Sequence, residues 1–223
     1  NVDLKIILFN NQVYGLTKGQ YSPTSLTGHR TKSSPMGSID YPLQPLSVAI
    51  GAEATFVART QDTNTRHLSM VLKRAAEHRG TAFVEVFQNC VVYNPMAWQH
   101  TTNSEVRDDN IVFLEEGQPL VFGKDRDRGV RMNGQQPEVI SLGNGVDEAD
   151  LISHNETIEN TSYSYMLSRM HNPEFPIPFG VLRAVNKPAY TDLLTSQVQS
   201  AIEKSGPGDL EKLLHNADTW EEI

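Results

Sequence analysis

The sequence has 223 residues, of which 38% are hydrophobic and 21% charged, so it can bury a core and is not a disordered chain. With 19 Lys and Arg residues against 27 Asp and Glu residues, its formal charge is −8, which argues against nucleic acid or an anionic membrane surface as the main partner. No apolar run approaches the roughly 20 residues that a membrane span needs. Cys90 is the only cysteine, which excludes an internal disulfide and leads us to expect a reducing, cytoplasmic setting.

Apolar and β-branched runs predict three strands, at residues 4–9, 55–59 and 82–87. Residues 43–51 are expected to form a short helix. Apolar residues at helical spacing predict a second helix, between an N-cap at residues 62–64 and a stop at Gly80. This alternation indicates βαβ units. The expected fold class is α/β, with a parallel sheet covered by helices on both faces.

The pattern changes after Cys90. The segments 111–114 and 120–122 flank a polar turn and predict a β-hairpin. Further elements are expected as a strand at 139–142, helices around 163–170 and 193–202, and an acidic tail at 209–223 that frays. We therefore divide the chain into an α/β part, residues 1–95, and a hairpin-and-helix extension packed on it, residues 96–223. The start at Asn1 has neither an initiator methionine nor a signal-peptide pattern, so we expect the chain to be the C-terminal part of a longer polypeptide.

A long loop and the lone cysteine follow two of the predicted strands. Residues 10–42 are rich in Gly, Pro, Ser and Thr and form a loop well beyond the usual limit of roughly 12–15 residues. Ligands of open parallel sheets bind outside the carboxyl ends of the strands. Amide and backbone oxygens after the Asn10-Asn11 pair suit Mg²⁺ or Ca²⁺, and Gly15 and Gly19 let N–H groups face an anion. The segment suits a diphosphate held through a divalent ion, but no standard phosphate motif is present, and an ordinary Asn/Gly turn fits equally well.

These residues also carry a resemblance to a known family. A strand ending in Asn-Asn resembles the closing half of the thiamine-diphosphate motif. Residues 10–20 (NNQVYGLTKGQ), 22–24 (SPT) and 31–37 (TKSSPMG) resemble the β subunits of 2-oxoacid:ferredoxin oxidoreductases, most of all the 2-oxoglutarate type. The similarity continues at residues 51–57 and 88–94, and more weakly at 178–183. It covers most of the chain and implies the thiamine-diphosphate-binding fold.

The resemblance implies a set of site residues. Mg²⁺ would be bound by the side-chain oxygen of Asn11 and the backbone carbonyl of Val13. Thiamine diphosphate would be held by Asn10, Tyr14, Gly15, Leu16, Thr17, Lys18, Gly19 and Gln20. Leu16 stands where the pyruvate-type enzymes carry Asn, and together with Lys18 it points to a longer or dicarboxylic 2-oxoacid.

Cys90 has two interpretations. By composition alone, a lone cysteine is usually a small hydrophobic core residue. The resemblance implies instead that Cys90 is the last of four cysteine ligands of a [4Fe–4S] cluster, for which thiolates are the normal ligands. The other three cysteines, and the Gly-Asp-Gly that opens the cofactor motif, would lie upstream of Asn1.

The implied activity is oxidative decarboxylation of a 2-oxoacid, with 2-oxoglutarate expected, to an acyl-coenzyme A and CO₂, with electrons passing through the cluster to ferredoxin. The base that activates the cofactor is expected on an α subunit, so no catalytic residue is assigned to this chain. Arg126, Arg128 and Arg131 are a candidate patch for docking an acidic ferredoxin. Two alternatives stay open: a cluster-free thiamine-dependent decarboxylase, and a non-catalytic interaction module that keeps the fold.

Overall fold

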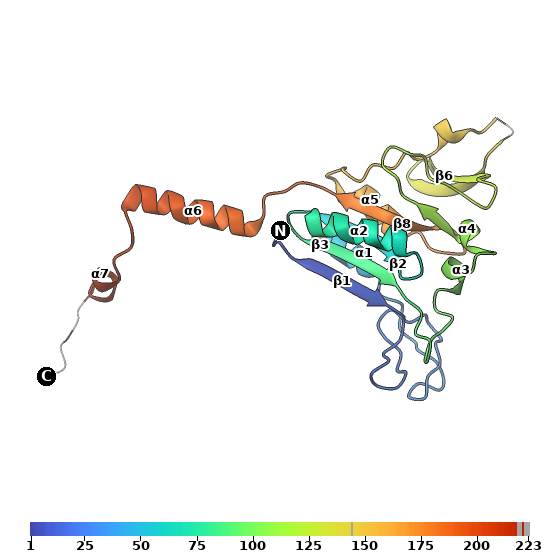
Figure 1. Ribbon diagram of the computed structural model, residues 1–223, viewed down its shortest axis with the longest axis horizontal. Coiled ribbons are helices and arrows are strands. Elements are labelled where there is room, and N and C mark those ends of the chain that lie inside the picture. Colours follow the sequence, from blue (N-terminus) through green and yellow to red (C-terminus); the bar gives the residue numbers. More distant parts are fainter. Residues whose placement is uncertain (144, 218–219, 221–223) are drawn as a thin grey trace.

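A five-stranded sheet with strand order β1-β3-β2-β8-β4 is the centre of the fold (Figure 1). The computed structural model describes residues 1–143, 145–217 and 220. The strands of the sheet are β1 (Lys5–Asn10), β2 (Phe56–Gln61), β3 (Ala82–Phe87), β4 (Ile111–Phe113) and β8 (Ile177–Ala184). β1, β3 and β2 run parallel, with Asn10 and Gln61 both opposite Phe87, so their carboxyl ends share one edge of the sheet. The three strands predicted from the sequence are confirmed.

β8 makes the sheet mixed rather than wholly parallel. It runs antiparallel to β2, with Gly180 opposite Arg59 and Ala184 opposite Phe56, and β4 runs parallel to β8. β8 therefore begins at the edge of the sheet where β2 ends, and it runs in the opposite direction. Seven of the eight residues of β8 are buried. The strand was not predicted because Pro178 and Gly180 break the local strand pattern.

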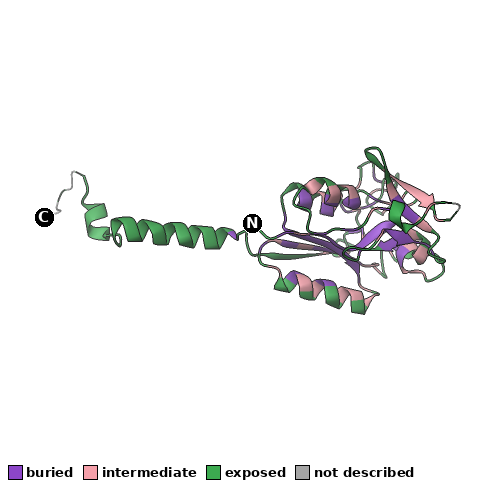
Figure 2. Ribbon diagram, turned by 90° about the horizontal axis from the view of Figure 1, so that it is seen from above, coloured by how far each residue is buried: buried purple, intermediate pink, exposed green. Residues whose placement is uncertain are grey.

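Helices cover both faces of the sheet, as predicted. α1 (Pro45–Gly51) and α5 (Thr161–Ser168) pack on one face through a core that includes Leu46 and Leu167. α2 (Thr65–Glu77) packs on the other face through Val71. It begins at Asn64, whose side chain accepts a hydrogen bond from the His67 N–H at 3.2 Å. Figure 2 shows the buried strands between these two helical layers.

A small antiparallel sheet lies beyond β4. Its strands are β5 (Val121–Phe122), β6 (Arg128–Asn133) and β7 (Gln136–Ser141), in the order β5-β6-β7. β7 confirms the strand expected at 139–142. The predicted hairpin of 111–114 with 120–122 is wrong, because β4 pairs with β8 and β5 pairs with β6. A hairpin does form, but between β6 and β7, where Gly134 takes the positive φ of 61° that the tight turn requires.

The part of the chain after residue 95 also contributes to the main sheet. β4 and β8 complete it, and three short elements connect the strands: α3 (Gln99–Thr102), α4 (Arg107–Asn110) and the 3₁₀ helix η1 (Glu148–Asp150). The main sheet thus contains strands from both sides of residue 95. The division of the chain at that residue stays an expectation.

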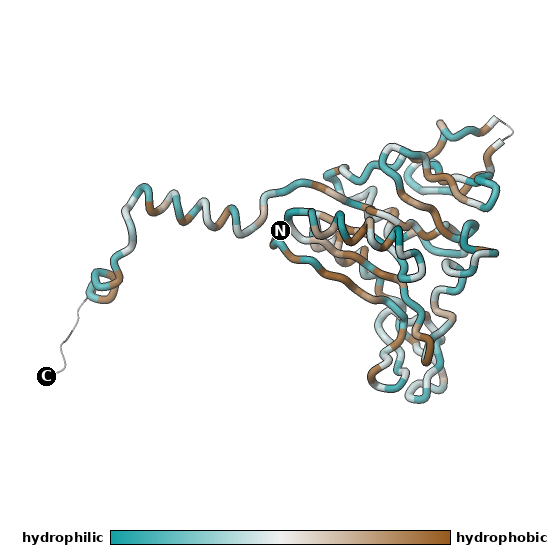
Figure 3. Tube along the Cα trace, in the orientation of Figure 1, coloured by the Kyte–Doolittle hydropathy of each residue, from teal (hydrophilic) through white to brown (hydrophobic). Residues whose placement is uncertain are grey.

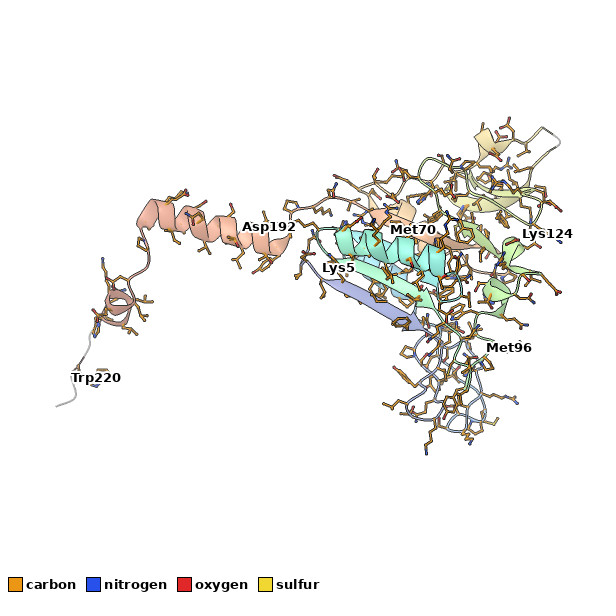
Figure 4. All side chains as sticks on the ribbon, viewed as in Figure 1. Lys5, Met70, Met96, Lys124, Asp192 and Trp220 are labelled. Atoms are coloured by element: carbon orange, nitrogen blue, oxygen red, sulfur yellow. The ribbon has the colours of Figure 1, made fainter. Side chains whose placement is uncertain are left out.

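A helical arm extends from the end of the sheet at which β1 begins (Figure 1). It consists of α6 (Tyr190–Ser205) and α7 (Leu210–Leu214), and no residue of either helix is buried. Figure 4 shows Asp192 at the end of α6 nearest the sheet and Trp220 far along the arm. The helix expected around 193–202 is confirmed. Of the expected fraying tail, residues 210–214 are helical, and residues 218–219 and 221–223 lie outside the described residues.

None of the helices in the described ranges is both long and apolar enough to cross a membrane. Figure 3 shows hydrophobic residues along β1, the edge strand of the main sheet, and its Ile7 and Phe9 side chains are exposed.

Candidate functional site

Asn10, the last residue of β1, is turned into the protein and only 5% exposed. Its side-chain NH₂ donates to the Glu85 carboxylate at 2.8 Å. Its side-chain oxygen accepts from the Gln12 N–H at 3.2 Å and from the Thr24 hydroxyl at 2.8 Å, and its carbonyl accepts from the Trp98 indole N–H at 2.7 Å. These contacts fix the point at which the chain leaves the sheet.

Asn11 and Val13 present two hard oxygen atoms just beyond this point. The side-chain oxygen of half-buried Asn11 accepts one long hydrogen bond, from the Val13 N–H at 3.3 Å. Within the described residues, no hydrogen bond is made to the Val13 carbonyl. An amide oxygen and a backbone carbonyl without a donor are typical Mg²⁺ ligands, so the donor set fits the ion that the resemblance implies.

We call residues 10–20 the β1 loop. Tyr14 and Gln20 close it, because the Tyr14 N–H donates to the Gln20 carbonyl at 2.8 Å and the Gly19 N–H donates back to Tyr14 at 3.0 Å. Within this closed segment the Lys18 N–H donates to the Gly15 carbonyl at 3.0 Å. Figure 1 shows the loop projecting beyond the carboxyl end of β1. Its exposed residues are Tyr14, Leu16, Thr17, Lys18 and Gln20.

The two glycines of the β1 loop differ in what they allow. Gly19 has a φ of +93°, and a Cβ added to it would lie 2.7 Å from Cδ1 of Tyr93. Gly15 meets nothing within 4 Å of an added Cβ, so the space beside it is open. Gly19 is therefore required for the loop to contact Tyr93, whereas Gly15 leaves room at the surface of the loop.

Cys90 begins a tight turn after β3, which we call the Cys90 turn, residues 90–94. The Asn94 N–H donates to the Cys90 carbonyl at 2.9 Å. The backbone N–H group of Tyr93, and to a lesser degree those of Val92 and Asn94, lie near the sulfur and hold the pKa of the Cys90 thiol below its usual range. Cys90 is half-buried and free. N–H groups directed at sulfur stabilise a thiolate, which is the form that binds a metal.

Asn94 joins the Cys90 turn to the β1 loop. Its side-chain NH₂ donates to the Asn11 carbonyl at 3.1 Å, and the ring of Tyr93 lies against Gly19. The structure thus brings together the predicted magnesium ligands and the predicted cluster ligand at one edge of the sheet. No sequence pattern pointed to Asn94 or Tyr93 as the residues that make this connection.

A basic cavity of about 410 Å³ opens beside these two segments. Lys18 and Gly19 line it from the β1 loop, and Val92 and Tyr93 line it from the Cys90 turn. The remaining lining residues are His29, Arg30, Thr31 and Lys32. Three cationic side chains and no acidic one among the lining residues suit an anionic ligand.

The arginines proposed as a docking patch do not form a free basic surface. Arg126 lies 3.7 Å from a Glu148 carboxylate oxygen, Arg131 lies 2.6 Å from Glu138, and Arg128 pairs with Asp109. Because each guanidinium is matched by a carboxylate, the expectation of a basic patch here is wrong.

One further group of titratable residues lies away from this edge. Oxygens of Glu116 and Glu156 and a nitrogen of His154 lie within 4.8 Å of one another. His154 already bonds the Tyr163 hydroxyl at 3.0 Å, and its other ring nitrogen bonds a main-chain carbonyl at 2.9 Å. Glu156 is paired with Arg74. These contacts account for the cluster as a structural network.

Residues 1–86 match the family model described as thiamine pyrophosphate enzyme, C-terminal TPP-binding domain. The chain is 40% identical over 224 residues to 2-oxoglutarate oxidoreductase subunit KorB of Mycobacterium tuberculosis, covering 99% of this chain and 59% of that protein. It is 43% identical over 116 residues to the 2-oxoacid:ferredoxin oxidoreductase subunit beta of Saccharolobus solfataricus, covering 52% of this chain and 36% of that protein.

A solved structure of 2-oxoglutarate:ferredoxin oxidoreductase from Magnetococcus marinus, with 2-oxoglutarate, coenzyme A and succinyl-CoA bound, has the same fold. The TM-score is 0.69 at 22% identity, covering 98% of this chain and 60% of that chain. The chain spans about three fifths of the length of the curated relative that it matches from end to end. The α/β thiamine-diphosphate fold is therefore confirmed, and along its whole length the chain is similar to a 2-oxoglutarate oxidoreductase β subunit.

Proposed function

We propose that the protein of which this chain is part is the β subunit of a cytoplasmic oxidoreductase that converts 2-oxoglutarate and coenzyme A into succinyl-CoA and CO₂, with two electrons passing to ferredoxin. The observation that carries this proposal is the junction at Asn94, where the oxygen donors of Asn11 and Val13 meet the Cys90 turn. The identity to KorB over the whole chain supports the choice of 2-oxoglutarate.

In this proposal the β1 loop is the anchor for the cofactor. Asn11 and Val13 would supply oxygen ligands to Mg²⁺, through which the diphosphate would be held, and backbone N–H groups beside the open space at Gly15 would bond the diphosphate directly. Bound thiamine diphosphate supplies the electron sink for decarboxylation. The proposal places the remaining magnesium ligand on a Gly-Asp-Gly segment outside this chain and the activating base on an α subunit.

The basic cavity supplies the charge that a dicarboxylic substrate needs. Lys18 lines this cavity from the β1 loop, and Arg30 and Lys32 add two further cations. 2-Oxoglutarate differs from pyruvate in carrying a second carboxylate. A cation that pairs with this carboxylate would favour 2-oxoglutarate over pyruvate more strongly than an apolar pocket could. Leu16, which is fully exposed at 100%, is available to contact a bound ligand or the α subunit.

Cys90 carries the redox part of the proposal. The N–H groups that hold its pKa low would also raise the reduction potential of an iron centre bound to the thiolate. The turn contacts the β1 loop through Tyr93 and Asn94, so a [4Fe–4S] cluster on Cys90 and three upstream cysteines would lie close to the cofactor.

The test uses the full-length β subunit assembled with its α subunit. The intact complex is expected to bind thiamine diphosphate in a Mg²⁺-dependent way, to contain iron and sulfide, and to reduce ferredoxin only when both 2-oxoglutarate and coenzyme A are present. Cys90→Ser should lose iron, sulfide and ferredoxin reduction but keep thiamine diphosphate binding.

Each alternative predicts a different result. Cofactor binding and decarboxylation without iron would identify a cluster-free decarboxylase. An intact complex that binds no thiamine diphosphate at saturating Mg²⁺ would identify a non-catalytic module.

A further inference from the structure

A buried chain of polar side chains crosses the three parallel strands beneath the β1 loop. Arg59 on β2 and Glu85 on β3 are direct register partners, and the Arg59 Nε donates to one Glu85 carboxylate oxygen at 2.9 Å. The other carboxylate oxygen accepts from the Asn10 NH₂ on β1 at 2.8 Å. One carboxylate therefore connects a guanidinium to the residue that begins the β1 loop.

These three polar side chains are shielded from water. Arg59 is 2% exposed, Glu85 1% and Asn10 5%. The Arg59 guanidinium also lies over the Phe87 ring at 5.1 Å, and Phe87 stacks on Trp98 at 3.5 Å. A buried ion pair contributes little net stability compared with apolar residues of the same volume, so stability alone does not explain why charge is placed here.

The hydrogen bond to Glu85 fixes the orientation of the Asn10 side chain and, through it, the start of the β1 loop. With its NH₂ fixed by Glu85, its side-chain oxygen must point the other way, toward the Gln12 N–H and the Thr24 hydroxyl. Gln12 has a positive φ of 55°, a conformation that a non-glycine residue keeps only where its surroundings enforce it. Asn11 and Val13 flank Gln12 on its two sides.

We propose that Arg59 and Glu85 are positioning residues for magnesium: through Asn10 they hold the Gln12 backbone so that the Asn11 side-chain oxygen and the Val13 carbonyl face one cation. The inference rests on the proposed function, because it concerns the ion that anchors thiamine diphosphate. It assigns Asn10 to holding the loop rather than to ligating the cofactor.

The test is a Mg²⁺ titration of thiamine diphosphate binding to the intact αβ complex, followed by calorimetry or tryptophan fluorescence. The double variant Arg59→Met/Glu85→Leu replaces the ion pair by apolar side chains and leaves no unpaired buried charge. We expect the Mg²⁺ concentration at half-saturation to rise about tenfold, as for one lost hydrogen bond to a charged group. The matched control is Arg74→Met/Glu156→Leu, which removes an ion pair remote from the loop and should leave the Mg²⁺ midpoint unchanged.

Coupling to Asn10 separates positioning from general destabilisation. Asn10→Ala should weaken Mg²⁺-dependent binding in the wild-type background, and by a smaller factor in the Arg59→Met/Glu85→Leu background, where the Asn10 amide has already lost its Glu85 partner. Equal losses in both backgrounds, or a wild-type Mg²⁺ midpoint in the double variant, would overturn the inference.

A milder variant covers the case in which the double variant does not fold. Thr24→Val, at a half-buried loop position, removes the hydroxyl that bonds the same Asn10 oxygen and should raise the Mg²⁺ midpoint about threefold. An unchanged midpoint in Thr24→Val also overturns the inference. A wild-type complex that shows no Mg²⁺-dependent binding at all would instead refute the proposed function.

Discussion

Substituting Gly19 by alanine perturbs the contact between the β1 loop and the Cys90 turn. Alanine at a φ of +93° is strained by about 1–3 kcal/mol, and its Cβ would have to displace the Tyr93 ring from 2.7 Å. If that strain disfavours the loop conformation that binds the cofactor, the apparent Kd for thiamine diphosphate rises by the corresponding factor, roughly 5- to 150-fold.

The assay is isothermal titration of the intact complex with thiamine diphosphate at saturating Mg²⁺. Gly15→Ala is the matched control, because its Cβ meets nothing within 4 Å and its φ is not positive. We expect Gly15→Ala to change the Kd less than threefold and Gly19→Ala to change it by at least fivefold. Equal Kd values for the two variants would refute the reasoning, since the steric difference between these positions would then have no effect on the site.

Three further outcomes follow from the structure. Burial lowers the pKa of His171 to about 4, whereas the same side chain in the unfolded chain binds a proton near pH 6.5. The free energy of unfolding should therefore fall by at most about 3 kcal/mol between pH 6.5 and pH 4. In urea unfolding, His171→Gln should show a smaller fall over this range, and a fall equal to that of the wild type would count against the burial of a neutral ring. Gly180→Ala, with a φ of +135° and an added Cβ 2.9 Å from the Leu114 carbonyl oxygen, should lower the free energy of unfolding by about 2–4 kcal/mol in the same assay, whereas wild-type stability would contradict the strain at β8. In the chain without partners, amide hydrogens of α6 should exchange orders of magnitude faster than those of β2, because no residue of this helix is buried and its contacts with the domain, from Asp192 to Arg79 and from Tyr190 to Asn1, lie in its first turn. Comparable protection along the whole helix would contradict this reasoning.

The elements predicted correctly are those that local chemistry determines. Each of these signals depends on residues only a few positions apart in the sequence: the apolar run of β1, the Asn64 cap and the helical spacing of apolar residues in α2. β8 and the pairing of β4 and β5 depend on partners far away in the sequence. A strand of two or three residues carries no local information about which partner it selects, and the hairpin prediction failed for that reason.

The candidate site divides in the same way. The sequence alone located the β1 loop and Cys90 after neighbouring strands, and parallel pairing of β1 with β3 brought them to one edge. The inward orientation of Asn10 could not be predicted, because its partners Glu85 and Trp98 lie 75 and 88 residues away. Asn94 is a long-range contact of the same kind, with no pattern of its own.

The most direct measurement of the central claim is the Mg²⁺-dependent affinity of the intact αβ complex for thiamine diphosphate, compared between wild type and Asn11→Ala. Removing one magnesium ligand should weaken binding at least about tenfold, while Asn64→Ala, which removes only the cap of α2, should leave affinity unchanged. A wild-type complex that does not bind the cofactor, or an Asn11→Ala complex that binds it as tightly as wild type, would contradict the account.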